Sequence, residues 1–546
     1  MTCSFTLRAM CLLLIAMNPL LLGGQNVVLN FTGMTPHLGQ KLEARLIDKR
    51  DLQEVDRAVI PSIVSANFEL TLVGETGGSY FIDFYADLSG NGVYDAPPVD
   101  HAWREEADNL ASGDNTVDFA HNTSFTDVRW RHTLTFSLLD MTPHLGQLLG
   151  VRLIDRTRTG KEAGRLVIAG VPSADFSIDL PFLELGHSYY LDFFADLSGN
   201  GLYDAPPVDH AWRLEIDAVD GDETASFSHG TNFTDIGWTD QVTVAMTDMN
   251  PHVGQLLELR VIDKDSGKEI GRTRRTVDVA TIDVSVPGLQ AGGNYQVDFY
   301  ADLNGNGTYN APGADHAWRL DWEGHPGGDA LLPFAHNTSF VDVDWEYLFT
   351  LHFTDMNPHL GQLLALRLVN SGTGQEVGSF SMPAIMFPEF YVEVPGIRLD
   401  ENYDADFYAD LNGNGAYDAP PADHAWRLNF DDETGDVELE FAHNTNFTDI
   451  EFPASVHLPS AVESFSAFPN PFDDRVGLQF GLTQAQEVRL QLFDQYGRTV
   501  IPIRELHALS GQNTVELDGL GQLPPGIYWL RVELAPAGLF VYPLVK

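Results

Sequence analysis

The chain has 546 residues, and its 31 Lys and Arg against 78 Asp and Glu give a formal net charge of −47 at pH 7. A surface this acidic repels phosphate backbones and anionic lipid headgroups, which argues against nucleic acid or direct bilayer binding. The two cysteines, Cys3 and Cys11, both lie in the first segment. The rest of the chain therefore has no thiol for a disulfide, a thiolate metal site or a cysteine nucleophile.

Residues 1–25 predict a secretory signal peptide. Arg8 precedes an apolar run that extends to Leu22, stops at Gly23-Gly24 and is too short to span a membrane. The alternative is a buried first strand or helix. No other stretch has the apolar length of a transmembrane helix, so we expect export and no membrane span in the mature protein.

The chain then repeats itself four times. A block that reads Met-Thr/Asn-Pro-His-Leu/Val-Gly-Gln begins at Met34, Met141, Met249 and Met356. This period is the length of a small domain and is too long for a solenoid unit. We expect four repeats at residues 26–130, 131–238, 239–345 and 346–452, then a linker at 453–466 and a distinct final module at 467–546.

Short alternating segments bounded by Gly, Pro and Asp predict strands and almost no helix. In the first repeat these predicted strands are residues 27–31, 42–48, 58–63, 68–73, 80–86, 102–106 and 116–120. Seven strands in one such repeat are typical of an immunoglobulin-like antiparallel β-sandwich. The predicted fold class is all-β: a tandem array of four such modules and a small C-terminal β-sandwich.

Two features of the repeat leave alternatives open. Asp83 lies on the strand face opposite the apolar residues Tyr80, Ile82 and Phe84, where it is either solvated or a ligand of the loop that follows. An aromatic residue stands at each junction between repeats and packs either between modules or within its own module. These aromatic residues are Trp130, Trp238, Trp345 and Phe452.

An acidic, glycine-rich loop follows the fifth strand of every repeat. Its side-chain oxygens stand at positions one, three, five and nine, with a glycine at six and a backbone carbonyl at seven, as in calcium loops. It resembles the calcium loops of secreted β-sandwich modules, with Asp100 or Asp83 completing the shell. The predicted calcium residues are Asp87, Ser89, Asn91, Val93 and Asp95; Asp196, Ser198, Asn200, Leu202 and Asp204; Asp302, Asn304, Asn306, Thr308 and Asn310; and Asp410, Asn412, Asn414, Ala416 and Asp418.

The calcium prediction has a simpler alternative, which is a tight turn in which the aspartates accept hydrogen bonds from backbone amides. In that case Asn91 or Gly92 has a positive φ. The third repeat has Asn310 where the others have aspartate, so we expect its loop to bind calcium most weakly.

Each repeat also contains three histidines, in the first repeat His37, His101 and His121. In a seven-stranded sandwich their three segments all lie at one pole, so the imidazoles can converge on copper, together with the thioether of Met34, or on zinc without it. The alternative is that they bond loop carbonyls. The alternative metal residues are His37, His101 and His121; His144, His210 and His229; His252, His316 and His336; and His359, His424 and His443.

The chain contains none of the usual sequence patterns of hydrolases, phosphate-binding loops or metalloproteases, so we expect no enzyme activity. The leading prediction is a calcium-stabilised extracellular protein with a role in adhesion or envelope structure and an unknown ligand or surface as its partner. The alternatives are an extracellular copper- or zinc-binding protein and an array of carbohydrate-binding modules.

The final module carries a recognisable set of motifs. It opens with Ala467-Phe468-Pro469-Asn470-Pro471-Phe472, continues through Asp494-Gln495-Tyr496-Gly497-Arg498 and Pro525-Gly526-Ile527-Tyr528, and ends in Lys546. It resembles the type A C-terminal sorting domain of type IX secretion cargo from Bacteroidetes and related bacteria. A flagellar-hook-like β module, which shares the Pro-Asn-Pro opening, is the alternative. The resemblance implies that the type IX secretion machinery is a partner, and that the protein is released from or attached to the surface of a Gram-negative bacterium.

Overall fold

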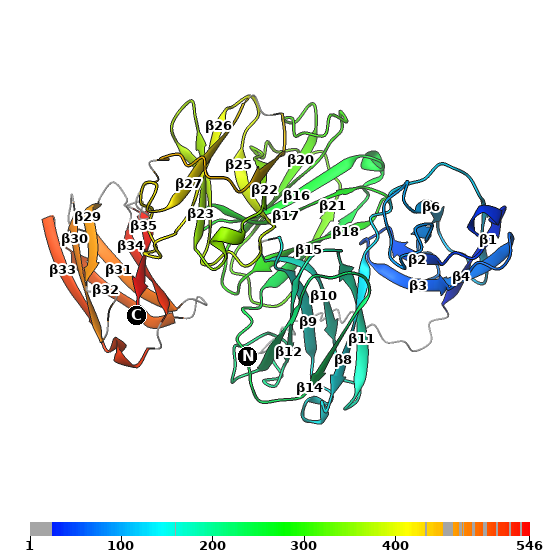
Figure 1. Ribbon diagram of the computed structural model, residues 1–546, viewed down its shortest axis with the longest axis horizontal. Helices are drawn as coiled ribbons and strands as arrows, with labels where there is room; N and C mark the ends of the chain where they lie inside the picture. The colour runs from blue at the N-terminus through cyan, green and yellow to red at the C-terminus, as the bar shows by residue number, and fades with distance from the viewer. Residues whose placement is uncertain are drawn as a thin grey trace, which may run out of the picture. The chain divides into compact units, whose positions relative to one another are not determined.

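The structure is a computed structural model that describes residues 24–546, apart from residues 159, 432–433, 451, 453–461, 469–471, 473, 483–485, 495–498, 509–510, 524–525 and 536–537. Most of the predicted signal peptide, most of the predicted linker and the Pro469-Asn470-Pro471 motif lie outside the described residues. Figure 1 shows the strands of each module.

The first repeat contains seven strands and one short 3-10 helix. They are β1 (Gln25–Thr32), η1 (Thr35–His37), β2 (Leu42–Asp48), β3 (Glu54–Ile60), β4 (Phe68–Gly74), β5 (Tyr80–Ala86), β6 (His101–Ala107) and β7 (Asn115–Ala120). All seven predicted strands are present. The third spans Glu54–Ile60, ahead of the predicted residues 58–63, and its pairing with β2 has a register shift between Leu46 and Ile47.

These strands form two sheets, one in the order β4-β1-β7 and the other in the order β3-β2-β5-β6. The all-β sandwich class is confirmed. One pairing differs from the prediction, since β1 and β7 run parallel, whereas all other pairs in the module are antiparallel. The chain crosses from the four-stranded to the three-stranded sheet between β6 and β7.

The next three repeats have the same two sheets and the same connections. The second comprises β8 (His132–Leu139), η2 (Thr142–His144), β9 (Leu149–Asp155), β10 (Lys161–Ile168), β11 (Phe176–Leu183), β12 (Tyr189–Ala195), β13 (His210–Ile216) and β14 (Glu223–Ser228). The third comprises β15 (Asp240–Thr247), η3 (Asn250–His252), β16 (Leu256–Asp263), β17 (Lys268–Thr276), β18 (Ile282–Leu289), β19 (Tyr295–Ala301), β20 (His316–Trp322) and β21 (Ala330–Ala335). The fourth comprises β22 (Tyr347–Thr354), η4 (Asn357–His359), β23 (Leu364–Asn370), β24 (Glu376–Met382), β25 (Phe390–Ile397), β26 (Tyr403–Ala409), β27 (His424–Phe430) and β28 (Val437–Ala442).

The final module is a smaller sandwich with its own core. It comprises β29 (Val462–Phe468), β30 (Arg475–Leu482), β31 (Gln486–Asp494), β32 (Thr499–Ala508), β33 (Gly511–Asp518), η5 (Leu520–Gln522), β34 (Ile527–Ala535) and β35 (Gly538–Val545). Its sheets have the orders β29-β30-β33 and β32-β31-β34-β35. Strand β29 starts at Val462, before the predicted end of the linker.

The core of each repeat lies between its two sheets. In β1 every second residue is buried, so Val27, Leu29 and Phe31 meet Ile82 and Phe84 of β5. The alternation that predicted this core face is therefore confirmed.

The outer face of the four-stranded sheet is also covered. Asp83 is fully buried there and accepts hydrogen bonds from Arg104 Nε at 2.6 Å and from Arg45 Nη2 at 3.1 Å. It is therefore neither a solvated residue nor a ligand of the acidic loop. Its equivalents Asp192, Asp298 and Asp406 bond the matching pairs of arginines.

The chain after β7 folds back over this outer face as an exit segment, residues 126–130. Trp130 packs in a small cluster with Tyr85 and Tyr94, and the Arg45 guanidinium lies 4.6 Å from its ring centroid. The Tyr94 hydroxyl donates to Asp127 Oδ1 at 2.7 Å. Of the two arrangements open for the junction aromatics, packing within its own module is the one found for each of them.

Candidate metal centre

The predicted calcium side chains lie together in the acidic loop of the first repeat, but many of their oxygens bond the loop itself. The Asp87 carboxylate accepts hydrogen bonds from the backbone N–H groups of Gly90 at 2.6 Å and Gly92 at 2.9 Å, and from the Ser89 hydroxyl at 3.1 Å. Asn91 Nδ2 donates to Asp95 Oδ2 at 2.8 Å. These are the contacts of a self-contained turn.

Asp100 closes the same loop from its far end. It is fully buried, and its two oxygens accept hydrogen bonds from the backbone N–H groups of Leu88, Ser89 and Asp95 at 2.9, 3.0 and 2.9 Å. The positive φ angles fall on Gly90 (73°) and Gly92 (89°), and Asn91 is not among the residues with positive φ. Glycine adopts this conformation without steric cost.

The other three loops repeat these contacts. The first aspartate of each loop accepts hydrogen bonds from the backbone N–H groups of both glycines. The side-chain oxygen of the asparagine at position five accepts a hydrogen bond from the backbone N–H of the residue at position seven. In the fourth repeat Asn412 Nδ2 and Asn414 Nδ2 both donate to Asp418 Oδ2, at 2.8 and 2.6 Å. In the third and fourth repeats the side chains at positions three, five and nine therefore point toward one another, whereas Ser89 and Ser198 at position three bond the aspartate at position one. Calcium binding by these loops stays a prediction.

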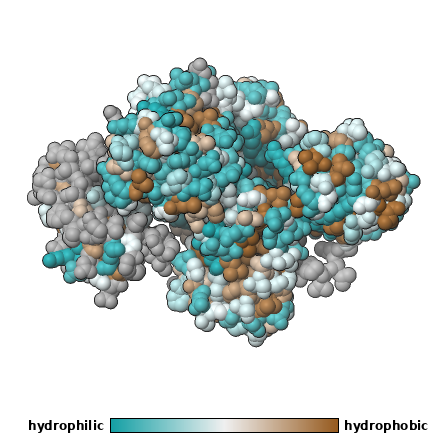
Figure 2. All heavy atoms as spheres, in the orientation of Figure 1, coloured by the Kyte–Doolittle hydropathy of each residue, from teal (hydrophilic) through white to brown (hydrophobic). Residues whose placement is uncertain are grey.

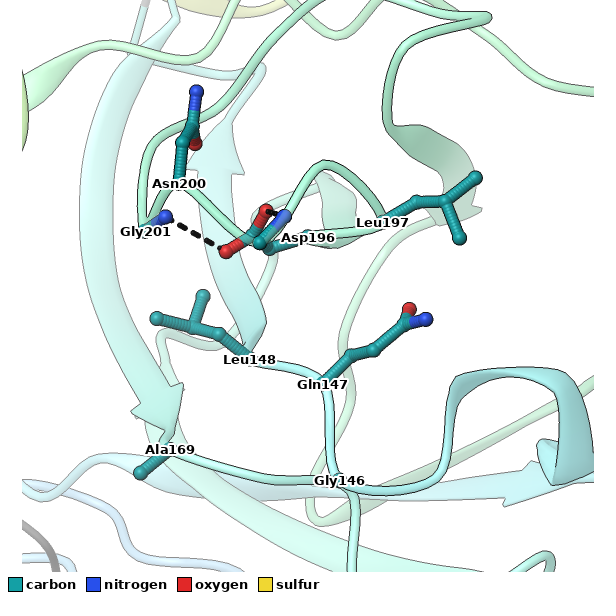
Figure 3. A pocket seen from close by; sticks show the side chains of 9 residues that line it. Gly146, Gln147, Leu148, Ala169, Asp196, Leu197, Asn200 and Gly201 are labelled. Carbon is teal, nitrogen blue, oxygen red and sulfur yellow. Dashed lines mark hydrogen bonds between the residues drawn. The ribbon is translucent and has the colours of Figure 1, made fainter.

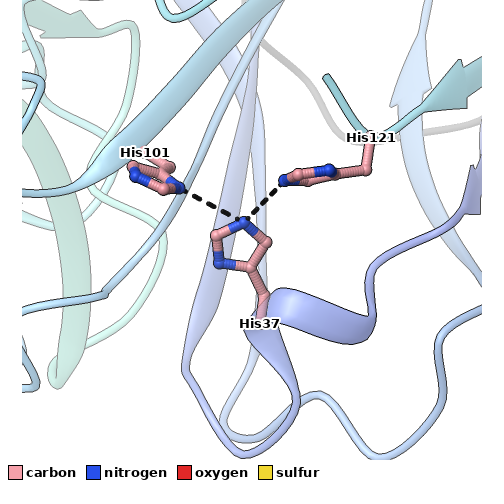
Figure 4. Close-up of side chains that lie close together, drawn as sticks. All are labelled: His37, His101 and His121. Atoms are coloured by element: carbon pink, nitrogen blue, oxygen red, sulfur yellow. Dashed lines mark hydrogen bonds between the residues drawn. The ribbon is translucent and has the colours of Figure 1, made fainter. Parts of the chain in front are cut away.

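The three histidines of the first repeat converge at one pole of the module. His37 ends η1, His101 begins β6, and His121 follows β7, where its backbone N–H donates to Thr32 O at the end of β1. Figure 4 shows the rings of His101 and His121 aimed at the ring of His37. His37 Nε2 lies 3.1 Å from His121 Nε2 and 3.4 Å from His101 Nδ1.

One contact fixes the tautomer of His37. Its Nδ1 lies 2.7 Å from Oε1 of Gln40, an atom that can only accept a hydrogen bond. Nδ1 therefore carries the proton, and Nε2 presents a lone pair to the other two imidazoles. The same pair recurs at 2.8 Å in His144–Gln147, His252–Gln255 and His359–Gln362.

All four repeats have this cluster. In each, one nitrogen from every histidine lies within 4.8 Å of the other two. The distance that matches His37 Nε2 to His101 Nδ1 is 3.3 Å in the second, third and fourth repeats. In these repeats the third histidine has a buried Nε2 without a hydrogen-bond partner, in His229, His336 and His443.

Aromatic side chains hold the rings in place. The Trp103 ring lies 5.6, 6.2 and 5.9 Å from the rings of His37, His101 and His121, close to equidistant from all three. Phe125 stacks on His101 with centroids 3.9 Å apart. Met34 is fully buried among the core residues of the module.

The surroundings favour neutral imidazoles. Burial lowers the pKa of His37, and the nearby His101 and His121 lower it further, while the bond to Gln40 opposes both effects. Burial and His121 lower the pKa of His101. The pKa values of the matching residues are lowered in the same way, which favours the neutral form of each ring, with one nitrogen free to bind a metal.

Sequence reasoning missed two of these residues. Gln40 appears in the repeated Met-Thr/Asn-Pro-His-Leu/Val-Gly-Gln block, always three residues after the histidine, and this constant spacing was the available signal. Phe125 likewise stands four residues after His121 and recurs as Phe233, Phe340 and Phe447. These three stack on His210, His316 and His424, the equivalents of His101.

A shallow pocket of about 510 Å³ lies between Gly146-Gln147-Leu148 and the acidic loop of the second repeat. Figure 3 shows Asp196 of that loop and the Gln147 side chain at its edge. Because Gln147 also bonds His144, the acidic loop and the histidine cluster are neighbours in the module.

Residues 466–536 match the family described as "Secretion system C-terminal sorting domain". No curated protein sequence matches the chain. Among the described residues, no helix has the length and apolar character needed to cross a membrane.

Several solved structures resemble parts of the chain at low identity. The Bacillus anthracis TIE protein is 9% identical, with 74% of this chain and 68% of that chain covered and a TM-score of 0.14. A streptococcal ancillary pilin is 10% identical, with 57% of this chain and 98% of the pilin covered and a TM-score of 0.14. A putative adhesin from Bacteroides ovatus is 10% identical, with 39% of this chain and 91% of the adhesin covered and a TM-score of 0.13. Scores this low carry no conclusion about function.

A sorting domain of this family indicates secretion to the cell surface or the extracellular space. The motifs at Ala467-Phe468 and Ile527-Tyr528 stand in strands β29 and β34 of the small sandwich, within the matched residues. The C-terminal module of this chain is a type IX secretion C-terminal sorting domain.

Proposed function

We propose that the protein is an exported, non-enzymatic array that binds a divalent transition metal, zinc or copper, at four three-histidine sites. Transition-metal binding, an alternative in the sequence analysis, is thus preferred to a general role in adhesion or envelope structure. The observation that supports it is the fourfold convergence of imidazole nitrogens within 4.8 Å.

Hydrogen bonding alone does not account for this arrangement. In the first repeat two ring nitrogens approach the single lone pair of His37 Nε2, and only one of them can donate along it. In the other repeats the third histidine leaves a buried nitrogen unpaired, which costs free energy. A bound cation gives every one of these lone pairs a partner.

The distances suit such an ion. With Zn–N bonds of about 2.0–2.1 Å, two ligands of a tetrahedral site lie about 3.3 Å apart. The separations from His37 Nε2 to its neighbours, 3.1 and 3.4 Å, fall on either side of this value. These two pairs of ligands therefore need little rearrangement on binding, and the third pair lies within 4.8 Å.

We propose calcium as a second ligand, at the acidic loops. The convergence of Asn412, Asn414 and Asp418 supports it, because oxygen ligands at positions three, five and nine are those a calcium loop uses. Binding requires the two amides to turn their oxygens inward and give up their present hydrogen bonds.

The test is metal content. We expect the full chain, stripped with a chelator and dialysed against Zn²⁺ or Cu²⁺, to hold four ions by elemental analysis, and the His101→Ala variant to hold three. Cu²⁺ should also quench tryptophan fluorescence, since Trp103 and its equivalents adjoin the sites. His352→Ala removes a histidine that pairs with Glu389 outside the clusters and should leave four ions bound. Fewer than one ion per chain at saturation would overturn the proposal.

A further inference from the structure

We propose that each metal-loaded three-histidine site keeps one coordination position for a ligand from outside the chain, and that this ligand is a neutral imidazole group and not an anion. The inference rests on the proposed function, because the ligand binds to the metal.

The chain supplies three donors to each site. Among the described residues, each cluster of histidine, cysteine, aspartate and glutamate donors holds three histidines and no fourth member. Asp100 is next to His101 in sequence, but its oxygens already accept three backbone hydrogen bonds. Gln40 Oε1 is bonded to His37. Since zinc with three protein ligands takes a fourth from solution, one position remains.

The side of each site away from the core is the less buried side. His37 and Trp103 are buried on the core side, while His101 and His121 are half-buried and reach the surface. Two apolar residues close to the ligands in the sequence are exposed: Leu38, which follows His37, at 47% and Val99, two residues before His101, at 52%. The position of Leu38 is exposed in every repeat, as Leu145 (48%), Val253 (49%) and Leu360 (45%). Figure 2 shows apolar patches among the hydrophilic residues of the face in view.

The nearby charge decides the class of ligand. The acidic loop of the second repeat contributes Asp196, Asp204 and Asp209, three negative charges against the two positive charges of the ion. In the first repeat Asp87, Asp95 and Asp100 are the matching carboxylates, and Lys41, whose Nζ donates to Gly92 O at 2.9 Å, offsets one of them. Asp100 stands next to the ligand His101 in the chain and is fully buried, so its charge is poorly screened by solvent. An anion approaching the ion is repelled by these carboxylates, whereas a neutral imidazole is not.

The apolar rim acts in the same direction. An imidazole carried on a peptide can bury its neighbouring side chains on Leu38 and Val99, which a small anion cannot do. The third repeat supplies an internal comparison, because Asn310 replaces an aspartate there and its loop carries one negative charge fewer. Its site should discriminate least against anions.

The experiment uses the full chain loaded with Co²⁺, whose visible absorption reports coordination. At pH 7.5 and constant ionic strength, imidazole should change the spectrum saturably at four sites, and acetate should need at least a tenfold higher concentration. Acetate binding as tightly as imidazole overturns the selectivity. Four bound Co²⁺ ions with no response to either probe overturn the open position alone, whereas a failure to bind Co²⁺ overturns the proposed function.

Two further probes distinguish a small-molecule imidazole from a histidine side chain of a protein partner. N-acetylhistidine amide represents a free small molecule, and a Leu-His-Leu peptide with blocked ends represents a protein partner. Tighter binding of the peptide, lost in the Leu38→Ser, Leu145→Ser, Val253→Ser and Leu360→Ser combination while imidazole binding persists, assigns the site to a protein partner. Equal affinity for the two probes assigns it to small imidazole compounds.

Discussion

Gln40 holds His37 in the tautomer that the proposed metal site requires, so replacing Gln40 should weaken metal binding at the first site without removing a ligand. In the Gln40→Leu variant, Nδ1–H of the fully buried His37 loses its acceptor at 2.7 Å. An unsatisfied buried donor costs about 1–3 kcal/mol. Loss of such an outer-shell partner typically costs 10–100-fold in metal affinity, which is about 1.4–2.7 kcal/mol and agrees with that range.

The assay needs one site at a time. In a full-chain background with His210→Ala, His316→Ala and His424→Ala, only the first site is intact, and its zinc affinity can be measured by competition with a chromophoric chelator. Gln40→Leu should raise the dissociation constant about 10–100-fold. Gln147→Leu in the same background alters a cluster that is already inactive and is the matched control. An unchanged constant in Gln40→Leu, or an equal loss in Gln147→Leu, would refute the reasoning.

Four other outcomes follow. The pKa values of His37, His101 and their equivalents are lowered below 6.5 in the folded protein. Because the unfolded state then binds more protons in acid, the melting temperature of the metal-free protein should fall as the pH drops below 6.5. Asp83→Asn should destabilise the first repeat by about 3 kcal/mol in calorimetry, because Arg45 and Arg104 lose their buried counter-charge; an unchanged melting profile would contradict this. If the loops bind calcium with a dissociation constant near 10⁻⁴ M, 1 mM calcium should add about 1.4 kcal/mol per loop and less in the third repeat, where Asn310→Asp should restore it. Deleting residues from Phe468 onward should leave the protein inside the cell envelope in a fractionation experiment, and normal surface display would count against the sorting role.

The sequence pattern was enough to place the strands, because a half-buried strand must alternate. Leu29 and Phe31 of β1 illustrate this, and even the boundaries of β2 and β5 agree with the predicted ranges. The parallel pairing of β1 with β7 was not predictable, since alternation reports which face is buried and not which strand is the neighbour.

The same limit explains Asp83. The alternation of apolar residues along the fifth strand placed Asp83 on the outer face of the sheet, where a carboxylate is usually solvated. Its burial depends on Arg45 and Arg104, which stand directly opposite it on β2 and β6, and on Trp130, which arrives from the exit segment. Only the cross-strand register brings these residues together.

The histidine clusters were accessible to reasoning about topology. Placing the first turn, the fifth loop and the end of the seventh strand at one pole predicted that His37, His101 and His121 could converge, and the structure brings them together. The orientation of each imidazole ring could not be predicted from the sequence, because it depends on the hydrogen bond to Gln40 and on the stacking of Phe125.

The exit segment also bears on how such an array changes over evolution. Because Trp130 and Tyr94 close the module to which they belong, a repeat that is duplicated or deleted as a whole brings its own cover with it. Such a change leaves no core of a neighbouring module open to water. Gene duplication can therefore alter the number of modules, and with it the number of histidine clusters, in whole steps, and each module keeps its own cover.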